Sequence, residues 1–430
     1  MNLLRAAASL AAALVVLVVS VGCAGVDRRP DLRAFAGGRY DAARTLAEDR
    51  IVEGGPDVTL DACFAGTAAL AQGDLRGAHR WFREAFDDLE DLTATTGETA
   101  GAIVGPDRSK RWKGDPHERC MNAYYLGVTY WLLGDPDNAA ASFKAGLLRD
   151  ADREKGAAQS DFALLWYLLG MAKREARHED RGAQALARAR ELLPENPSVD
   201  PKVANEANVL LVLDVGLGPR KVAAGPHGSQ LRFARPRYVT ASALVTENGR
   251  TIGRTAQAVD VFLQAATRGA KTMDDVNAAK AAVKDAAVVG GAVIASNAGN
   301  NRNQAIGLGL VLAGLLLPAE TDLRSWDTLP GEVHVLAMKL PLGEHVLRVE
   351  PQDSAGTTVA GLGREIRVTV REGHVTFAWL RAAPAPVEDG RIETSAAPDG
   401  SRRGPASSGP ERGPGVALRT SSTHPKAVRP

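Results

Sequence analysis

The sequence predicts an α+β protein with more than one domain. Its first half predicts an N-terminal array of helical hairpins, and its second half a mixed domain with a glycine-rich helical hairpin and C-terminal antiparallel β strands. Three observations support this prediction: an internal repeat of small and aromatic residues, several late runs of alternating apolar and polar residues, and a length of 430 residues, which allows two or three domains.

The composition argues against several classes of function. The chain has 52 Lys and Arg against 51 Asp and Glu, so it lacks the basic excess of a nucleic-acid-binding protein. The sequence shows no carboxylate pair and no Ser/His/Asp or Cys/His grouping that would predict catalytic residues. It also shows no spacing of ligands that would predict a metal site, and no cofactor is expected. An envelope enzyme acting on glycan or peptide is therefore the least favoured alternative.

Residues 1–22 predict a lipoprotein signal peptide. Arg5 precedes the apolar run Ala6–Val19, which is short for a membrane-spanning helix of about 20 residues. Cys23 then follows small residues, as in a bacterial lipobox, although Ser20 stands where an aliphatic residue is usual. Cleavage before Cys23 would leave a cysteine for acylation, and the alternatives are an ordinary secretory signal or an uncleaved anchor.

A lipidated Cys23 implies attachment to a membrane of the cell envelope. Ala24 follows instead of an acidic residue, which by similarity to lipoprotein sorting signals favours the outer membrane, facing the periplasm. In an exported protein Cys63 and Cys120 could form a disulfide, but two unpaired small residues within helices are the simpler interpretation.

Residues 23–198 predict the helical array. One set of residues recurs at matching offsets in a second segment: Gly66, Gly73, Ala78, Phe82 and Ala85 against Gly127, Gly134, Ala139, Phe143 and Gly146. A partial unit lies around Phe35–Leu46, and a fourth unit spans Phe162–Pro194. Glycines allow close helix approach or end a helix, and phenylalanines fill the space between helices. The pattern resembles the tetratricopeptide repeat, whose members bind proteins or peptides.

An insertion at Leu92–Arg119 interrupts the repeats and places basic residues around Trp112. This cluster predicts contact with an anionic partner, or else a solvated loop whose tryptophan folds back over the helices. Asn122 and Tyr125 follow on the first helix of the third unit. Trp112, Asn122 and Tyr125 are therefore the candidate partner-binding residues.

Residues 199–382 predict the mixed domain. Asn208–Val215 has strand character and ends in the turn Gly216–Lys221. Tyr238–Thr246 and Thr251–Arg254 predict strands joined by a hairpin turn. The alanine-rich stretch Ala256–Ala298 predicts helix.

Residues 287–317 predict the glycine-rich helical hairpin, either buried over a sheet or touching a membrane. Trp326 is expected to seal a core edge, with Arg324 and Asp327 paired locally. Four strands are expected after it, with tight turns joining paired neighbours: Val333–Leu340, His345–Val349, Glu365–Val370 and Val375–Leu380. Residues 383–430, rich in Pro, Gly, Ser and Arg, predict a disordered tail.

Three segments together resemble an uncharacterised family of bacterial tetratricopeptide lipoproteins: Gly114–Arg119, Gly216–Lys221 and Arg324–Pro330. His117 departs from the pattern, since an aromatic residue is usual there. The resemblance implies a fold and a location but no activity. It favours a non-catalytic, lipid-anchored scaffold for protein partners, and the alternative is a component of an envelope export or surface-assembly machinery.

Overall fold

The computed structural model describes residues 29–94, 111–151, 161–224, 230–266, 322–382 and 393–394. The predicted signal peptide, Cys23, the glycine-rich segment 287–317 and most of the predicted tail lie outside these residues. Within the described part of the chain, no helix has the length and apolar character needed to cross a membrane.

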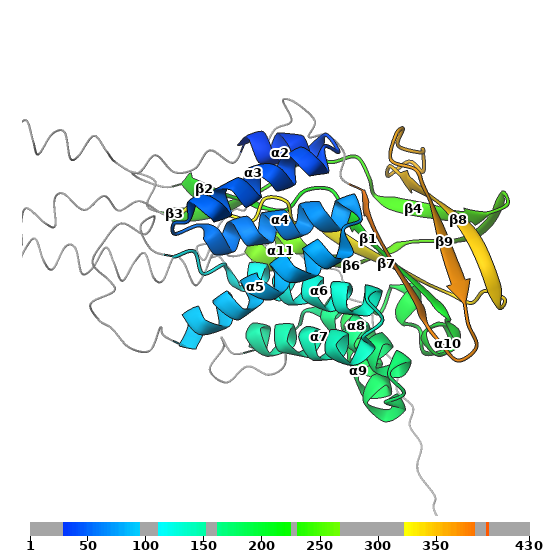
Figure 1. Ribbon diagram of the computed structural model, residues 1–430. Helices are drawn as coiled ribbons and strands as arrows, with labels where there is room; N and C mark the ends of the chain where they lie inside the picture. Colours follow the sequence, from blue (N-terminus) through cyan, green and yellow to red (C-terminus); the bar gives the residue numbers. More distant parts are fainter. Residues whose placement is uncertain are drawn as a thin grey trace, which may run out of the picture. The chain divides into compact units, whose positions relative to one another are not determined.

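The first half consists of consecutive helices, each packed against the next one along the chain. Figure 1 shows them from α2 to α9, followed by the short helix α10. Their bounds are α2 (Arg29–Ala36), α3 (Tyr40–Glu53), α4 (Val58–Gln72), α5 (Leu75–Ala94), α6 (Pro116–Leu132), α7 (Pro136–Ala151), α8 (Ala163–Glu175), α9 (Glu179–Leu192), η4 (Pro197–Val199) and α10 (Pro201–Glu206).

Three of the helical hairpins share one close contact. A side chain on Gly66 of α4 would collide with the Phe82 ring of α5, and Gly127 of α6 faces Phe143 of α7 in the same way. In the third hairpin Gly170 of α8 faces a leucine, Leu186 of α9. The glycines let the paired helices approach closely enough for these side chains to fill the space between them.

The turns within these hairpins also match. Gly73 and Gly134 take the left-handed conformation, with φ of 91° and 87°, as the repeat pattern predicts for glycines that end a helix. At the equivalent turn between α8 and α9 the left-handed residue is Arg177, with φ of 64°. A non-glycine residue is strained there because its Cβ crowds the backbone.

The second half forms three sheets. The strands are β1 (Val209–Val215), β2 (Arg220–Ala224), β3 (Gln230–Arg235), β4 (Ser242–Glu247), β5 (Arg250–Arg254), β6 (Ala256–Asp260), β7 (Glu332–Met338), β8 (Gly343–Gln352), β9 (Arg364–Val370), β10 (Thr376–Ala382) and β11 (Glu393–Thr394). Sheet 1 has the order β10-β1-β7-β6, sheet 2 the order β5-β4-β8-β9, and sheet 3 the order β11-β3-β2. A short helix, α11 (Val261–Gln264), follows β6.

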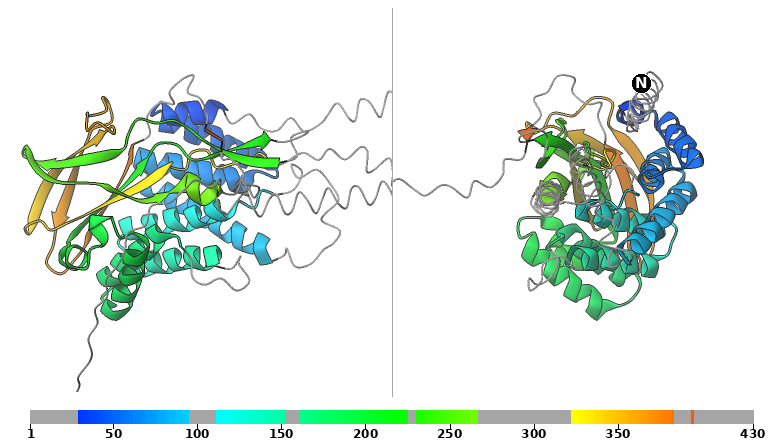
Figure 2. Two further views of the ribbon diagram at one scale, coloured as in Figure 1. Left: turned by 180° about the vertical axis from the view of Figure 1, so that it is seen from behind. Right: turned by 90° about the vertical axis from the view of Figure 1, so that its left-hand side faces the viewer.

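Sheet 1 lies between the helices and sheet 2, which explains why every residue of β1 is buried. Alternate β1 side chains such as Leu211 and Leu213 pack in one core with strands of sheet 2. The intervening Leu210 and Val212 belong to the core of the helices. Figure 2 shows the strands of sheet 1 beside the helices from two further directions. The core of the helices therefore includes residues of sheet 1 and joins the two halves of the chain.

Two predictions about the second half are wrong. Ala256–Asp260, expected to begin a helix, is strand β6 and pairs with β7. The turns after β7 and β9 were expected to join paired strands, but β7 and β10 belong to sheet 1 whereas β8 and β9 belong to sheet 2. Each turn therefore carries the chain from one layer to the other.

Several strand pairings have no counterpart in the sequence prediction, including the three that follow. β10 runs parallel to β1, so sheet 1 is mixed. β2 and β3 form an antiparallel pair directly after the turn at Gly216–Lys221. Within the predicted tail, Glu393–Thr394 forms β11 and pairs with Ala234 and Arg235 of β3.

Candidate binding surfaces

The first helix of each hairpin turns one side toward sheet 1, and we call this side the inner face of α4, α6 and α8. Helix α6 is buried along its length from Pro116 to Thr129. Contacts link α6 to β10 and α8 to β6. The extended segment 322–330 also lies against the inner face, where Thr67 and Thr328 share a hydrogen bond of 2.7 Å. The chain's own second half therefore covers the inner face.

A buried acid anchors α6 to sheet 1. The Tyr124 and Tyr125 hydroxyls each donate a hydrogen bond of 2.7 Å to a different carboxylate oxygen of Asp214 in β1. Arg381 of β10 lies 3.5 Å from the same carboxylate. Burial raises the pKa of Asp214, and the nearby guanidinium opposes that rise. The tyrosines and arginine stabilise a charge that would otherwise be costly to bury.

Arg381 also holds the segment 322–330 in place. Its Nη2 donates to the carbonyl oxygens of Thr328 and Leu329, at 3.0 and 3.1 Å, and to that of Gly216 at 2.8 Å. The Trp326 ring is fully buried beside Tyr125, with ring centroids 5.6 Å apart. The segment is thus held by both charge and aromatic packing.

The candidate partner-binding residues all lie inside the protein. Trp112, Asn122 and Tyr125 are 1%, 0% and 0% exposed. Asn122 donates to the Phe82 carbonyl oxygen at 3.3 Å, and Tyr125 is held by Asp214. Partner contact at these residues stays a prediction, but in this conformation their contacts are internal.

The other residues singled out by the sequence are also buried or paired. Cys63 and Cys120 are buried in the helical core and are not bonded to each other, and the Cys120 thiol donates to the Gly146 carbonyl oxygen at 3.4 Å. Trp326 is buried, as expected of a residue that seals the core. Arg324 pairs with Asp322 and with Asp57 of the first half, at 2.7 and 2.8 Å, whereas Asp327 accepts a hydrogen bond from its neighbour Ser325. Through Asp57, Arg324 links the two halves of the chain.

An open groove of about 880 Å³ runs across α7, α8 and α9. Its floor includes the half-buried Trp166 and the buried Leu169, both from α8. We call it the α7–α9 groove. It is lined by Ala140, Ala141, Lys144, Trp166, Leu169, Lys173, Arg181, Gln184, Ala185, Ala187, Arg188 and Glu191.

The α7–α9 groove carries a positive charge excess. Four of its lining residues are cations and one, Glu191, is an acid. Arg188 pairs with Glu191 at 2.6 Å, and Lys173 lies 3.4 Å from the exposed Asp137. Lys144 and Arg181 are exposed, and no ion pair is assigned to either within the described residues. An apolar floor under a basic rim suits an acidic ligand with one apolar side chain.

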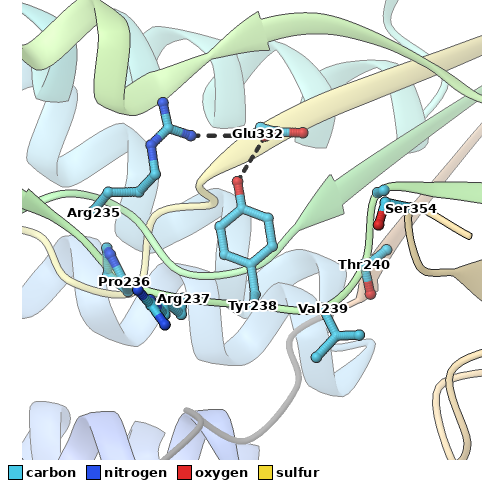
Figure 3. A pocket seen from close by; sticks show the side chains of 9 residues that line it. Arg235, Pro236, Arg237, Tyr238, Val239, Thr240, Glu332 and Ser354 are labelled. Atoms are coloured by element: carbon cyan, nitrogen blue, oxygen red, sulfur yellow. Dashed lines mark hydrogen bonds and ion pairs between the residues drawn. The ribbon is translucent and has the colours of Figure 1, made fainter. Parts of the chain in front are cut away.

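A smaller pocket of about 500 Å³ lies beside β3 and the start of β7 (Figure 3). Figure 3 shows Arg235 and Tyr238 both reaching toward Glu332. The Tyr238 hydroxyl donates to Glu332 at 2.9 Å, and Arg235 lies 3.8 Å from Glu332 and 2.5 Å from Asp260. These polar groups already bind one another, so the pocket has fewer polar groups available to a ligand than the groove has.

Comparison with known proteins adds no assignment. No protein-family model matches the chain, and a search of curated proteins finds no match. The site geometry is therefore the basis for a functional proposal.

Proposed function

We propose that this protein is a non-catalytic scaffold of the cell envelope, lipid-anchored through Cys23, which binds protein or peptide partners on a tetratricopeptide-type helical array. The shared contacts of the three hairpins support the array type. Gly66 with Phe82 and Gly127 with Phe143 have the spacing of the glycine and the large apolar residue in that repeat. Stacked hairpins of this type serve as extended binding surfaces.

The binding surface that we propose is the α7–α9 groove, because the inner face is occupied by the chain itself. The single observation that carries the proposal is the basic, apolar-floored form of this groove. Trp166 and Leu169 offer a site for one apolar side chain, and the surrounding cations attract carboxylates. The partner is accordingly an acidic segment of another protein that contains an aromatic or large aliphatic residue.

Binding of defined peptides tests the groove. The probes are a labelled peptide with one phenylalanine among glutamates, and its counterpart with lysines in place of the glutamates. We expect the acidic peptide to bind the full chain and the basic one to bind much more weakly, in fluorescence anisotropy at low salt. Added salt should weaken binding, because it screens exposed charges.

A matched pair of charge reversals separates the groove from general electrostatics. Lys144→Glu with Arg181→Glu should weaken binding of the acidic peptide about tenfold, which corresponds to about 1.4 kcal/mol. Lys202→Glu with Arg250→Glu makes the same charge change at exposed cations outside the groove and should have little effect. Equal losses in both double variants would show that only net charge matters and would refute the groove as the site.

Lipid attachment has a separate test. Cells supplied with a chemically tagged palmitate should label the wild-type protein but not Cys23→Ser. Label that persists in Cys23→Ser, or that is missing from the exported wild-type chain, would remove the lipoprotein part of the proposal without affecting the groove.

A further inference from the structure

A lysine and two acids meet in the interior where α6 begins. Asp115 is the residue that caps α6, and Glu118 lies one turn into the helix. Lys221 comes from β2, far away in the sequence, yet its Nζ lies 3.0 Å from Asp115 Oδ2 and 3.8 Å from Glu118 Oε2. The side chains of Lys221, Asp115 and Glu118 are 3%, 7% and 1% exposed.

The surroundings of this triad are aromatic. Trp112 and Phe233 are both buried, and Phe233 pairs with Lys221 across the β2–β3 ladder. His117, the neighbour of both acids, packs edge-on against Phe233 with ring centroids 5.5 Å apart. Such an interior disfavours charged groups and excludes most water.

Glu118 is held rigidly between the two halves of the chain. Its Oε2 accepts a hydrogen bond of 2.6 Å from the backbone N–H of Asp115. Its Oε1 accepts one of 2.7 Å from the N–H of Trp326. The acid is therefore fixed beside Lys221 and Asp115 and cannot swing away from them.

The charges around Lys221 are unequal. Asp115, Glu118 and Asp322 all act on its ammonium group, and together they raise its pKa against the effect of burial. Asp322 is itself neutralised by Arg324. Burial raises the pKa of Glu118 to about 7, so near neutral pH this acid exchanges a proton readily. The site thus contains an ammonium group, a carboxyl group and a proton carrier, with little water.

We propose that Lys221 and Asp115 condense into an intramolecular amide bond, with Glu118 as the proton carrier. The Lys221 ammonium loses a proton, the resulting amine attacks the Asp115 carboxyl carbon, and the C–N bond forms. One carboxyl oxygen leaves with two protons as water, and Glu118 passes a proton from the nitrogen to that oxygen. An ammonium and a carboxylate become one neutral amide and one water, so atoms and charge balance without a further reactant.

The interior favours the product over the ion pair. A buried ion pair carries the desolvation cost of two charges, whereas a neutral amide carries only the smaller cost of a polar group. The released water also leaves a site that is poor in water, which opposes the reverse hydrolysis. The bond would tie the start of α6, in the helical array, to β2 in the second half of the chain.

Peptide mass spectrometry after tryptic digestion tests the bond in the purified full chain. Trypsin releases Asp115 in the peptide 114–119, and it cuts after Arg220. If Lys221 is bonded, trypsin does not cut after it, and one branched species should appear with the summed mass of peptides 114–119 and 221–232 less one water. If Lys221 is free, the digest contains the linear peptides 114–119 and 222–232 instead, and this result in the wild type overturns the proposal.

Variants assign the roles within the triad. Lys221→Arg keeps the charge but should give only linear peptides, and Glu118→Gln should slow formation of the branched species at least tenfold. Asp115→Asn should form the same branched species with loss of ammonia in place of water. Loss of water at Asp115 alone, through a cyclic imide, is excluded because that reaction needs an N–H on the next residue, which is Pro116. A branched species that persists in Lys221→Arg would contradict the assignment.

Discussion

The two sides of the helical array differ sharply in what they contact. The inner face of α4, α6 and α8 is buried against sheet 1 and the segment 322–330, through aromatic rings and one shared buried acid, Asp214. The α7–α9 groove remains open, with basic residues around an apolar floor. The same hairpin thus provides a structural joint on one side and an accessible surface on the other. Substitutions on the two sides should accordingly change different properties.

Breaking the joint should have the largest effect on stability. Asp214→Ala removes the acceptor of two tyrosine hydroxyls and leaves Arg381 buried without its acid. We expect the free energy of unfolding to fall by about 3–5 kcal/mol, the usual cost of breaking a buried charge pair. Urea unfolding followed by circular dichroism measures the change.

Asp87→Ala is the matched control, because Asp87 is exposed and pairs with Arg83 on the helix surface. Its cost should stay within about 0.5 kcal/mol. Similar losses for Asp214→Ala and Asp87→Ala would mean that the inner face is not the stronger joint.

Acid should weaken the joint through His117. Burial lowers the pKa of this imidazole to about 4, from about 6.5 in the unfolded chain. Between these values the unfolded chain binds a proton at His117 that the folded chain does not, so the contribution of His117 to stability falls as the pH drops from about 6.5 to 4. At pH 4 the loss caused by His117 should reach about 3 kcal/mol. Glu118, whose pKa burial raises to about 7, contributes in the opposite direction over this range.

His117→Phe removes this titrating group, so on acidification the variant should lose less stability than the wild type. Thermal unfolding midpoints between neutral pH and pH 4 measure the difference between variant and wild type. Curves of equal slope would show that another group causes the acid sensitivity.

The close approach of the two helices in a hairpin depends on a glycine. Gly127→Ala should destabilise the protein by about 1–3 kcal/mol, because the new methyl group collides with the Phe143 ring. Phe143→Leu copies the pairing of Gly170 with Leu186 and should recover part of that loss when combined with Gly127→Ala. A double-mutant cycle on unfolding free energies measures the coupling. Strict additivity of the two changes would show that this contact does not set the helix spacing.

The smallest effect should come from the turn between α8 and α9. Arg177→Gly relieves a left-handed residue and should stabilise the protein by about 0.5–1 kcal/mol, after the greater freedom of glycine in the unfolded chain is deducted. Arg177→Ala removes the same side chain but keeps the strain, so it should not stabilise. If the alanine variant also gains in melting temperature, the stabilisation comes from loss of the arginine side chain and not from relief of backbone strain.

The helical half was largely predictable from the sequence because its signals are local. Glycines recur where helices touch or end, and in the turns Asp74 and Asp135 accept backbone hydrogen bonds from Gly77 and Asn138 at 2.9 and 3.0 Å. The repeat pattern could not predict that the second half of the chain covers the inner face of these helices. Tyr125 lies on the predicted first helix, but only the distant Asp214 determines that its hydroxyl is buried.

The sheets were less predictable because strand partners depend on distant residues. Four of the five residues of β6 are polar or alanine and do not exclude a helix, and pairing with β7 decides the outcome. β1 was predicted from its apolar run, whereas its parallel neighbour β10 lies far along the chain. Lys221 was expected in the turn Gly216–Lys221. Nothing in the sequence predicted that its side chain would contact Asp115 in the interior.

The place of β10 beside β1 has a consequence for how the chain matures during synthesis. β1 and the helices before it leave the ribosome well before Thr376–Ala382, the strand that completes one side of sheet 1. Until then, Tyr124, Tyr125 and Asp214 lack Arg381. Pairings between such distant segments form slowly and leave apolar surface exposed in the meantime. The nascent chain must therefore pass through a stage in which its most aromatic face is open, and that interval is when it most needs protection from aggregation.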